Sequence, residues 1–208
     1  MTKLESNKST TYFPDEVELA DCEILDMVIR GPKSWSSRIT YKNENLKLQT
    51  PIMLTSFDLN AYNYAGQSKD NYSLCVSLDE TVDGVAALKR LIEKIDATTI
   101  NTFKSKTDGA EFISSIKEPK DKESKFPPVL RCKLVSNAKR FKCAIYVGGK
   151  EKHLNIDECK NLLKKGTKVK LVLQLNPVWK VDNKYGVSWQ ILALDVVQSK
   201  VEFRNDFN

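Results

Sequence analysis

The sequence predicts a mostly β fold, a five-stranded Greek-key barrel that is interrupted by one helical insertion. Three observations support this prediction. Several segments alternate apolar and polar residues, which is the pattern of half-buried strands. One segment, which begins at Thr81, spaces its apolar residues at the period of an amphipathic helix. The basic residues gather in the second half of the chain, and many of them fall on segments with the strand pattern.

The composition is that of an ordinary globular protein. The chain has 208 residues, of which 41% are hydrophobic and 29% are charged, so it can build a core without disulfide or metal staples. No apolar run approaches the roughly 18 residues of a membrane span, and residues 1–11 lack the apolar stretch of a secretory signal. We therefore expect an intracellular protein with no membrane partner.

The cysteines and the single histidine argue against a metal site. The five cysteines are odd in number, are widely spaced and include no Cys-x-x-Cys pair, which indicates reduced thiols. Because His153 is the only histidine, zinc sites of the usual ligand spacing are disfavoured. We expect no cofactor.

We expect a single domain over residues 33–200, with the helical insertion at about 81–127. Residues 1–32 form an acidic segment ahead of it, and residues 201–208 form a short tail. The acidic segment contains Glu23–Ile29, which has the composition of a short strand.

The first strands of the barrel are expected between Arg38 and Asp79. Arg38–Lys42 and Leu46–Thr50 have strand character on either side of a polar turn, so they predict a hairpin that ends before Pro51. Asn71–Asp79 alternates strictly, which makes it the clearest half-buried strand in the first half of the chain.

The insertion is predicted to hold two helices and a loop. In the first helix the apolar stripe consists of Val85, Leu88, Ile92 and Ile95. Asp108–Ile116 is predicted to be a second helix with Asp108 as its N-cap. Lys117–Lys125 has no apolar residue to bury and contains a proline, so it predicts a loop.

Strand patterns return in the second half. Val129–Val135 and Arg140–Val147 alternate and are joined by a short link, which predicts a hairpin. Asn155–Lys165 fits a short helix that ends at Gly166. Lys168–Asn176 alternates again, and after a turn-like stretch a last strand runs from Val187 to about Val197.

The order of these elements is strand, strand, insertion, strand, strand, helix, strand, strand. This order is that of the OB-fold, in which a helix connects the third and fourth strands of a five-stranded Greek-key barrel.

Charge and aromatic residues together suggest a polyanionic partner. Residues 129–184 contain fourteen Lys and Arg against four Asp and Glu, a net charge of +10. Single-stranded nucleic acid needs cations near its phosphates and flat rings on which its bases stack, and this region supplies both. The predicted nucleic-acid-binding residues are Arg131, Lys133, Arg140, Lys142, Tyr146, Lys168, Lys170, Trp179, Lys180, Lys184 and Tyr185.

Some of these residues also have a purely structural interpretation. Trp189 has the spacing of Val187 and Ile191 and is therefore expected in the core. Tyr185 precedes a glycine, so its ring would also suit a turn. No catalytic constellation is present, since the stretch around Gly149 and Lys150 lacks the first glycine and the final hydroxyl of a P-loop. We therefore expect a protein that is not an enzyme.

The segment from Gly166 to Leu192, which reads GTKVKLVLQLNPVWKVDNKYGVSWQIL, resembles the closing strands of a known protein group. That group is the OB-fold single-stranded DNA-binding proteins of large nucleocytoplasmic DNA viruses, of the African swine fever virus type. Leu48–Pro51 and the strand Tyr72–Asp79 with its following helix are similar to that group as well. A more distant resemblance is to the replication single-stranded DNA-binding proteins of short-tailed phages.

The resemblance implies sequence-independent coating of single-stranded DNA during viral replication, recombination or repair, at the site of viral DNA replication in the host cytoplasm or nucleus. It supports Trp179, Lys180, Lys184 and Tyr185 as loop contacts. The phage proteins end in a long acidic tail that contacts replication partners, whereas Val201–Asn208 is short and nearly neutral. A comparable role would fall to the acidic residues 1–30.

Two other functions remain open at the level of sequence. The basic face would also suit an acidic protein partner, with the acidic N-terminal segment occupying it in the free protein. Stacking and phosphate contacts do not distinguish DNA from RNA. The sequence also leaves open a homo-oligomer in which an exposed barrel strand pairs two chains.

Overall fold

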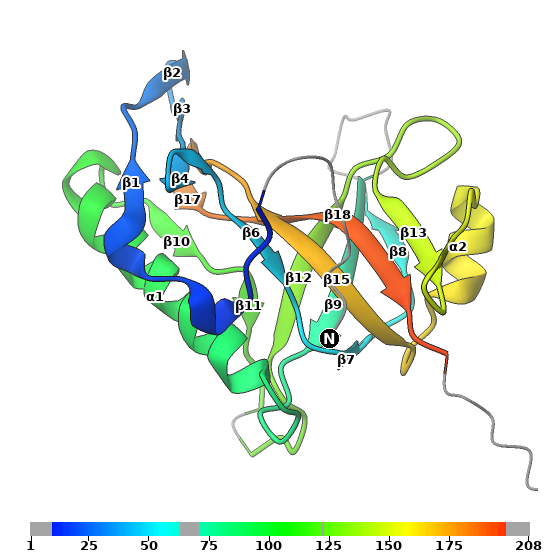
Figure 1. Ribbon diagram of the computed structural model, residues 1–208. Helices are drawn as coiled ribbons and strands as arrows, with labels where there is room; N and C mark the ends of the chain where they lie inside the picture. The colour runs from blue at the N-terminus through cyan, green and yellow to red at the C-terminus, as the bar shows by residue number, and fades with distance from the viewer. Residues whose placement is uncertain (1–9, 63–70, 122, 199–208) are drawn as a thin grey trace, which may run out of the picture.

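A closed β-barrel lies at the centre of the computed structural model, which describes residues 10–62, 71–121 and 123–198 (Figure 1). Its strands come from both halves of the chain. In order around the barrel they are β6 (Lys47–Gln49) with β7 (Met53–Leu54), β9 (Asn71–Ser77), β12 (Val129–Leu134), β18 (Trp189–Val196) and β15 (Lys168–Leu175), which returns to β6 and β7.

The strand pairing is that of an OB-fold. β12 and β18 run parallel, and the other main pairs are antiparallel. A bridge between Thr55 and Val76 joins the first strand segment to β9 and closes the circle. The predicted fold class, a mostly β OB-fold barrel with a helical insertion, is therefore confirmed.

The barrel interior is filled by every second residue of its strands. Along β9 the even-numbered residues Tyr72, Leu74 and Val76 are buried, while the residues between them are half-exposed. On β12 the side chains of Leu130 and Cys132 are fully buried. The strict alternation in the sequence therefore specified correctly which residues face inward.

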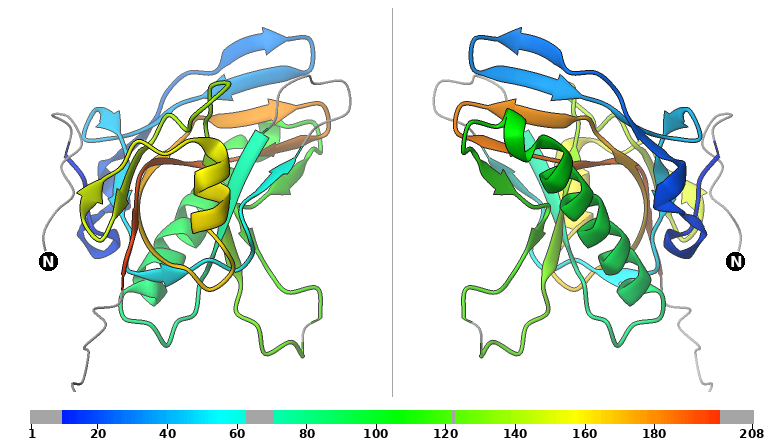
Figure 2. Two further views of the ribbon diagram at one scale, coloured as in Figure 1. Left: turned by 90° about the vertical axis from the view of Figure 1, so that its right-hand side faces the viewer. Right: turned by 90° about the vertical axis from the view of Figure 1, so that its left-hand side faces the viewer.

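Two helices lie on opposite sides of the barrel, as Figures 1 and 2 show. α1 (Val85–Phe103) begins after Gly84, whose φ of 79° suits glycine, and it buries the predicted stripe together with Leu91, Thr99 and Phe103. α2 (Ile156–Leu162) starts with a capping box between Asn155 and Glu158. Both helices were predicted from their apolar period.

The prediction of a second helix over Asp108–Ile116 is wrong. Asp108 and Gly109 have φ angles of 52° and 76°, which form a tight turn rather than a helix start. The following residues form two short strands, β10 (Glu111–Ile113) and β11 (Ile116–Lys117). β10 pairs with the distant β17, and β11 pairs with the next strand, β12, and this pairing overrides the weak local helical pattern.

The predicted hairpin between Val129–Val135 and Arg140–Val147 is also wrong. The second strand is shorter than expected, β13 (Ala144–Val147), and it does not pair with β12. Instead both strands run parallel to β18 along the same edge of it, β12 beside Trp189 and Gln190 and β13 beside residues 193–196, because β15 occupies the other edge. Only the link between β12 and β13 is a short antiparallel turn, closed by a bridge between Ser136 and Phe141, so the two basic segments do not project from one long hairpin.

A second sheet, which we call the arm sheet, extends away from the barrel and carries the hairpin of β2 and β3 at its far edge (Figure 2). The residues predicted as a turn before the last strand contribute one of its strands. In spatial order its strands are β10, β17 (Lys184–Gly186), β16 (Val178–Val181), β3 (Ser34–Ser37) and β2 (Val28–Gly31).

The N-terminal elements pack onto the barrel and α1. β1 (Cys22–Ile24) pairs with β4 (Ile39–Tyr41), whose hairpin partner is only the two-residue β5 (Glu44–Asn45). The predicted hairpin over residues 38–50 is thus present only in part, because β6 turns away to pair with β15. The remaining short elements are η1 (Pro14–Glu16), η2 (Leu19–Asp21), η3 (Lys104–Lys106), β8 (Asn60–Tyr62) and β14 (Lys150–Glu151).

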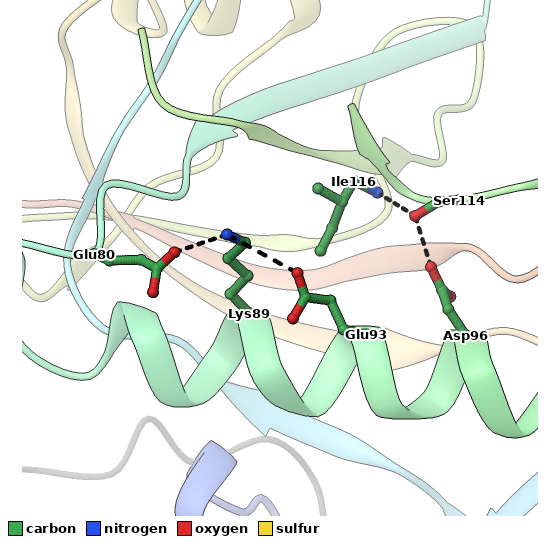
Figure 3. A network of polar contacts seen from close by, with 6 residues as sticks. All are labelled: Glu80, Lys89, Glu93, Asp96, Ser114 and Ile116. Carbon is green, nitrogen blue, oxygen red and sulfur yellow. Dashed lines mark hydrogen bonds and ion pairs between the residues drawn. The ribbon is translucent and has the colours of Figure 1, made fainter. Parts of the chain in front are cut away.

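A polar network attaches α1 to the strands of the insertion (Figure 3). The Ser114 hydroxyl donates to Asp96 Oδ2 at 2.6 Å and accepts from the Ile116 backbone N–H at 3.0 Å. The other carboxylate oxygen of Asp96 is buried, and no described residue forms a hydrogen bond with it. Because burial disfavours the charged form, the pKa of Asp96 rises to about 6.

Candidate nucleic-acid interface

Two cations stand side by side on the outer surface of β12. Arg131 and Lys133 alternate with the buried residues of the strand and therefore point away from the barrel interior. Cys75 lies opposite Arg131, and Ser73 lies opposite Lys133. Arg131 is held in place by its Nε, which donates to the Ser73 hydroxyl at 3.2 Å. The guanidinium thus has a fixed position beside Lys133.

The electrostatics of this pair favour an anionic partner. Partial burial and the neighbouring charge of Arg131 both lower the pKa of Lys133, because each destabilises the ammonium form. Among the residues that the structure describes, Lys133 has no carboxylate within ion-pair distance. A phosphate placed between these side chains would relieve the repulsion.

Strand register extends the site into a polar row around the barrel. Lys133 lies opposite Ser73 on one side and Gln190 on the other, and Gln190 lies opposite Gln174. Gln174 in turn faces Lys47 on β6. Residues opposite one another in a sheet share a face. The lysines and glutamines therefore form one row, with a lysine at each end and the two glutamines between them.

The arm sheet continues this outer surface and presents an aromatic ring. Trp179 on β16 lies opposite Gly186 on β17 and Ser36 on β3. The indole is half-buried, and its N–H is buried with no hydrogen-bond partner among the described residues. On the other side of β3, Arg30 Nε donates to the Ser36 hydroxyl at 3.1 Å, so the guanidinium lies on the same face as the indole.

Alternation along β17 and β18 relates the two parts of the surface. Trp189, Val187 and Tyr185 are all buried and point inward. Lys184 is exposed, whereas Gly186 is buried against the backbone of Ile113. Because Trp179 lies opposite Gly186, its ring shares a face of the arm sheet with Lys184. We call this surface, from β12 to β3, the outer face.

Lys180 and Tyr185 were predicted as loop contacts, but the structure places both on the opposite, inner side of the arm sheet. Lys180 is 7% exposed, and its ammonium donates to the Asp182 backbone carbonyl at 3.0 Å. Tyr185 is 4% exposed and meets Phe112 edge to face at 5.2 Å between ring centroids. Neither side chain is placed to meet a ligand on the outer face.

Arg140 and Lys142 lie in the loop that leads to β13. Asn137 organises the turn, since its side-chain oxygen accepts from the backbone N–H groups of Lys139 and Arg140 at 3.0 and 2.7 Å. Arg140 and Lys142 are exposed, and the described residues offer neither of them an ion-pair partner. They supply charge beyond the upper end of β12 rather than on its face.

The remaining predicted residues belong to another part of the barrel. Tyr146 lies opposite Asp195, which lies opposite Lys170 on β15. Lys170 is four residues from Gln174 along the strand, about 13 Å away from the polar row. Lys168 lies further still. The structure therefore does not bring Tyr146, Lys168 and Lys170 together with Arg131 and Lys133, and a buried carboxylate accompanies them.

Sequence reasoning missed several residues of the outer face, among them Lys47, Gln174, Gln190 and Arg30. Lys47 and Gln174 were on predicted strands, but only the pairing of β6 with β15 shows that they are neighbours. Arg30 lay in the segment interpreted as acidic. The sequence shows Lys47, Gln174 and Gln190 on predicted strands, but it does not show the strand register that makes them neighbours.

Metal and membrane signals are weak in the described part of the chain. No group of three or more His, Cys, Asp or Glu there could hold a metal ion. The five cysteines are free, with Cys132 and Cys159 buried. Within the same residues, no helix is both long and apolar enough to cross a membrane.

No protein-family model matches the sequence, and no curated protein sequence does either. Among solved structures, the chain is similar to the single-stranded DNA-binding protein from bacteriophage Enc34 in complex with ssDNA. The TM-score is 0.52 with 15% identity, over 86% of this chain and 98% of the phage chain. A C-terminally truncated form gives a TM-score of 0.53 with 14% identity, over 85% and 96% of the two chains.

At these identities the likeness establishes a shared fold. It confirms, at the level of fold, the resemblance to phage single-stranded DNA-binding proteins. The similar structures are of a single-stranded DNA-binding protein. The resemblance to proteins of large nucleocytoplasmic DNA viruses stays a prediction.

Proposed function

We propose that this protein binds single-stranded DNA without sequence preference and coats it during viral DNA replication, recombination or repair. The DNA crosses the outer face, with its phosphates near Arg131, Lys133 and Lys184 and a base on the ring of Trp179. The protein acts as a binder and performs no chemistry on the DNA. It works wherever viral DNA is replicated.

One observation carries this proposal. Two adjacent cations, Arg131 and Lys133, occupy the outer surface of an OB-fold barrel, and partial burial together with the charge of Arg131 lowers the pKa of Lys133. Folding alone gains nothing from placing two like charges together, whereas a polyanion turns the arrangement into an attraction.

A half-exposed tryptophan on the same surface supports a single-stranded rather than a duplex ligand. Bases are accessible for stacking only in a single strand, and each stacked base contributes about 1–3 kcal/mol whatever its identity. Stacking on a ring makes no hydrogen bond to a base edge, which favours binding without sequence preference.

The proposal is tested by fluorescence anisotropy with a labelled oligo-dT, the matching RNA and a duplex, over a series of salt concentrations. We expect tight binding to the single DNA strand, weaker binding to the duplex, and a log–log salt slope of about −0.7 for each phosphate neutralised. Equal, weak binding to all three would contradict the proposal and would favour an acidic protein partner. Equal tight binding to DNA and RNA would extend the ligand to RNA.

A matched pair of variants locates the site. Lys133→Gln removes one cation from the outer face, so the salt slope should become less steep by about 0.7. Lys94→Gln removes an exposed lysine from α1, away from the outer face, and should leave the slope unchanged. If both variants behave alike, binding depends on total charge and not on the outer face.

A further inference from the structure

The edge of the arm sheet carries an apolar strand that the described residues leave unpaired on one side. β2 pairs with β3 alone and is the last strand of the sheet. Its side chains and those just before it are unusually exposed for apolar residues: Ile29 is 69% and Val28 is 49% exposed. Leu25 and Met27 are exposed as well. Edge strands with this character readily pair with another strand.

The sequence of this edge is complementary to itself. In Asp26-Met27-Val28-Ile29-Arg30, an antiparallel pairing centred on Val28 places Asp26 opposite Arg30 of a second copy, and Met27 opposite Ile29. The twofold symmetry repeats each contact. Opposite charges and apolar side chains therefore match at every position, and such cross-strand pairs stabilise a sheet.

The guanidinium of Arg30 is already positioned for this contact. Its Nε donates to the Ser36 hydroxyl, which leaves its two terminal nitrogens for a carboxylate. Asp26 and Arg30 are both exposed, and the described residues contain no ion pair for either of them.

We propose that two copies of this chain form a symmetric dimer by antiparallel pairing of β2 with β2, centred on Val28. The two arm sheets become one continuous sheet. Because the dyad of two antiparallel neighbours is perpendicular to their sheet, both outer faces look in the same direction.

The register has a consequence for the ligand, and this step rests on the proposed function. Val28, Ser36 and Trp179 lie in one cross-strand row. A dyad at Val28 continues that row into the second copy, so the two Trp179 rings lie five strand spacings apart, about 24 Å. One single strand can then contact both rings, and an oligo-dT long enough to span them should bind the dimer more tightly than a short one.

Cysteine cross-linking tests the register directly. In Val28→Cys the two thiols would face each other across the dyad, so mild oxidation should give a covalent dimer. In Ile29→Cys the equivalent positions are diagonal, about 7–8 Å apart, and should cross-link far less. The wild-type chain, with its own five cysteines, is the background control. Equal cross-linking of both variants, or none of Val28→Cys, would overturn the proposed register.

Charge exchange tests the dimer without any cysteine. Size-exclusion chromatography with light scattering, without DNA, should show a dimer of the full chain. Asp26→Lys should weaken the dimer at least tenfold, since it faces Arg30, and the double variant Asp26→Lys with Arg30→Glu should restore it. A wild-type chain that stays monomeric at about 100 µM would rule the dimer out. Absence of DNA binding by a dimeric protein would overturn the proposed function and leave the dimer standing.

Discussion

The two faces of the arm sheet use the same residue types for different purposes. On the inner face, Trp35, Lys180 and Tyr185 form a buried cross-strand row, and Trp35 packs on Phe103 of α1 at 4.8 Å between ring centroids. On the outer face, Trp179 is half-buried and Lys184 is exposed. The identity of a side chain therefore says less about its role than the face on which alternation places it.

The largest effect is expected on the inner face. Trp35→Ala removes a buried ring from its contact with Phe103 and leaves a cavity, so the free energy of unfolding should fall by about 3–5 kcal/mol. Urea denaturation followed by circular dichroism measures this loss. The affinity of the remaining folded protein for oligo-dT should be unchanged, and a selective loss of affinity would show that the two faces are not independent.

The next effect concerns pH. The pKa of Asp96 is about 6 in the folded protein and near 3.8 in the unfolded chain. The folded state favours the protonated carboxyl, and this contribution to the free energy of unfolding is fully present below about pH 3.8 and is lost as the pH rises through 6. Asp96→Asn keeps an acceptor for Ser114 and removes the buried charge, so it should raise the free energy of unfolding at pH 8 by about 1–3 kcal/mol.

The matched measurement for Asp96 is the denaturation midpoint of both proteins at several pH values between 4 and 8. The gap between wild type and Asp96→Asn should open as the pH rises. Parallel profiles would show that this carboxyl titrates normally. The pH dependence belongs to the side of the sheet packed on α1, so DNA affinity should not follow it.

On the outer face, Trp179→Ala should weaken oligo-dT binding by about 1–3 kcal/mol through the loss of base stacking. Trp179→Phe keeps a flat ring and should retain most of the affinity. Anisotropy titrations of the two variants show whether the affinity depends on an aromatic ring at this position. Wild-type affinity in Trp179→Ala would remove this residue from the site.

The smallest and most selective effect separates two lysines that are four residues apart. Lys184→Met removes an exposed cation from the outer face, and the log–log salt slope should become less steep by about 0.7. Lys180→Met replaces a buried cation by an apolar side chain of similar length, and the slope should not change. The opposite result would mean that the arm sheet binds DNA with its inner face.

Much of the fold was contained in the alternation of residues. The strands β9, β12, β15 and β18 and the helix α1 were all predicted, because burial of one face imposes a strong period on the sequence. What alternation does not specify is the partner of each strand. Nothing in Val129–Val147 indicates that both of its strands pair with β18 rather than with each other, so the predicted hairpin and the joint placement of its basic residues failed together.

The candidate site shows the same limit at the level of single residues. Trp179 and Lys180 are neighbours on one strand and cannot both point outward, which the sequence alone already implies. Which of the two points outward depends on α1, because Phe103 of that helix packs against the face of the sheet that carries Trp35 and Tyr185. That helix is about 80 residues earlier in the chain, so local patterns could not settle it.

The pairing of β18 with both β12 and β13 also shapes how the chain reaches this structure. Cys132 pairs with Trp189, and Ala144 pairs with Ala193, so both strands need a partner that comes later in the chain than either of them. Until the ribosome has released that strand, Cys132 and Lys133 of β12 have no neighbour on the side away from β9, and the ring cannot close. Such long-range parallel pairing slows folding, and the half-finished barrel has an open edge that is prone to aggregation.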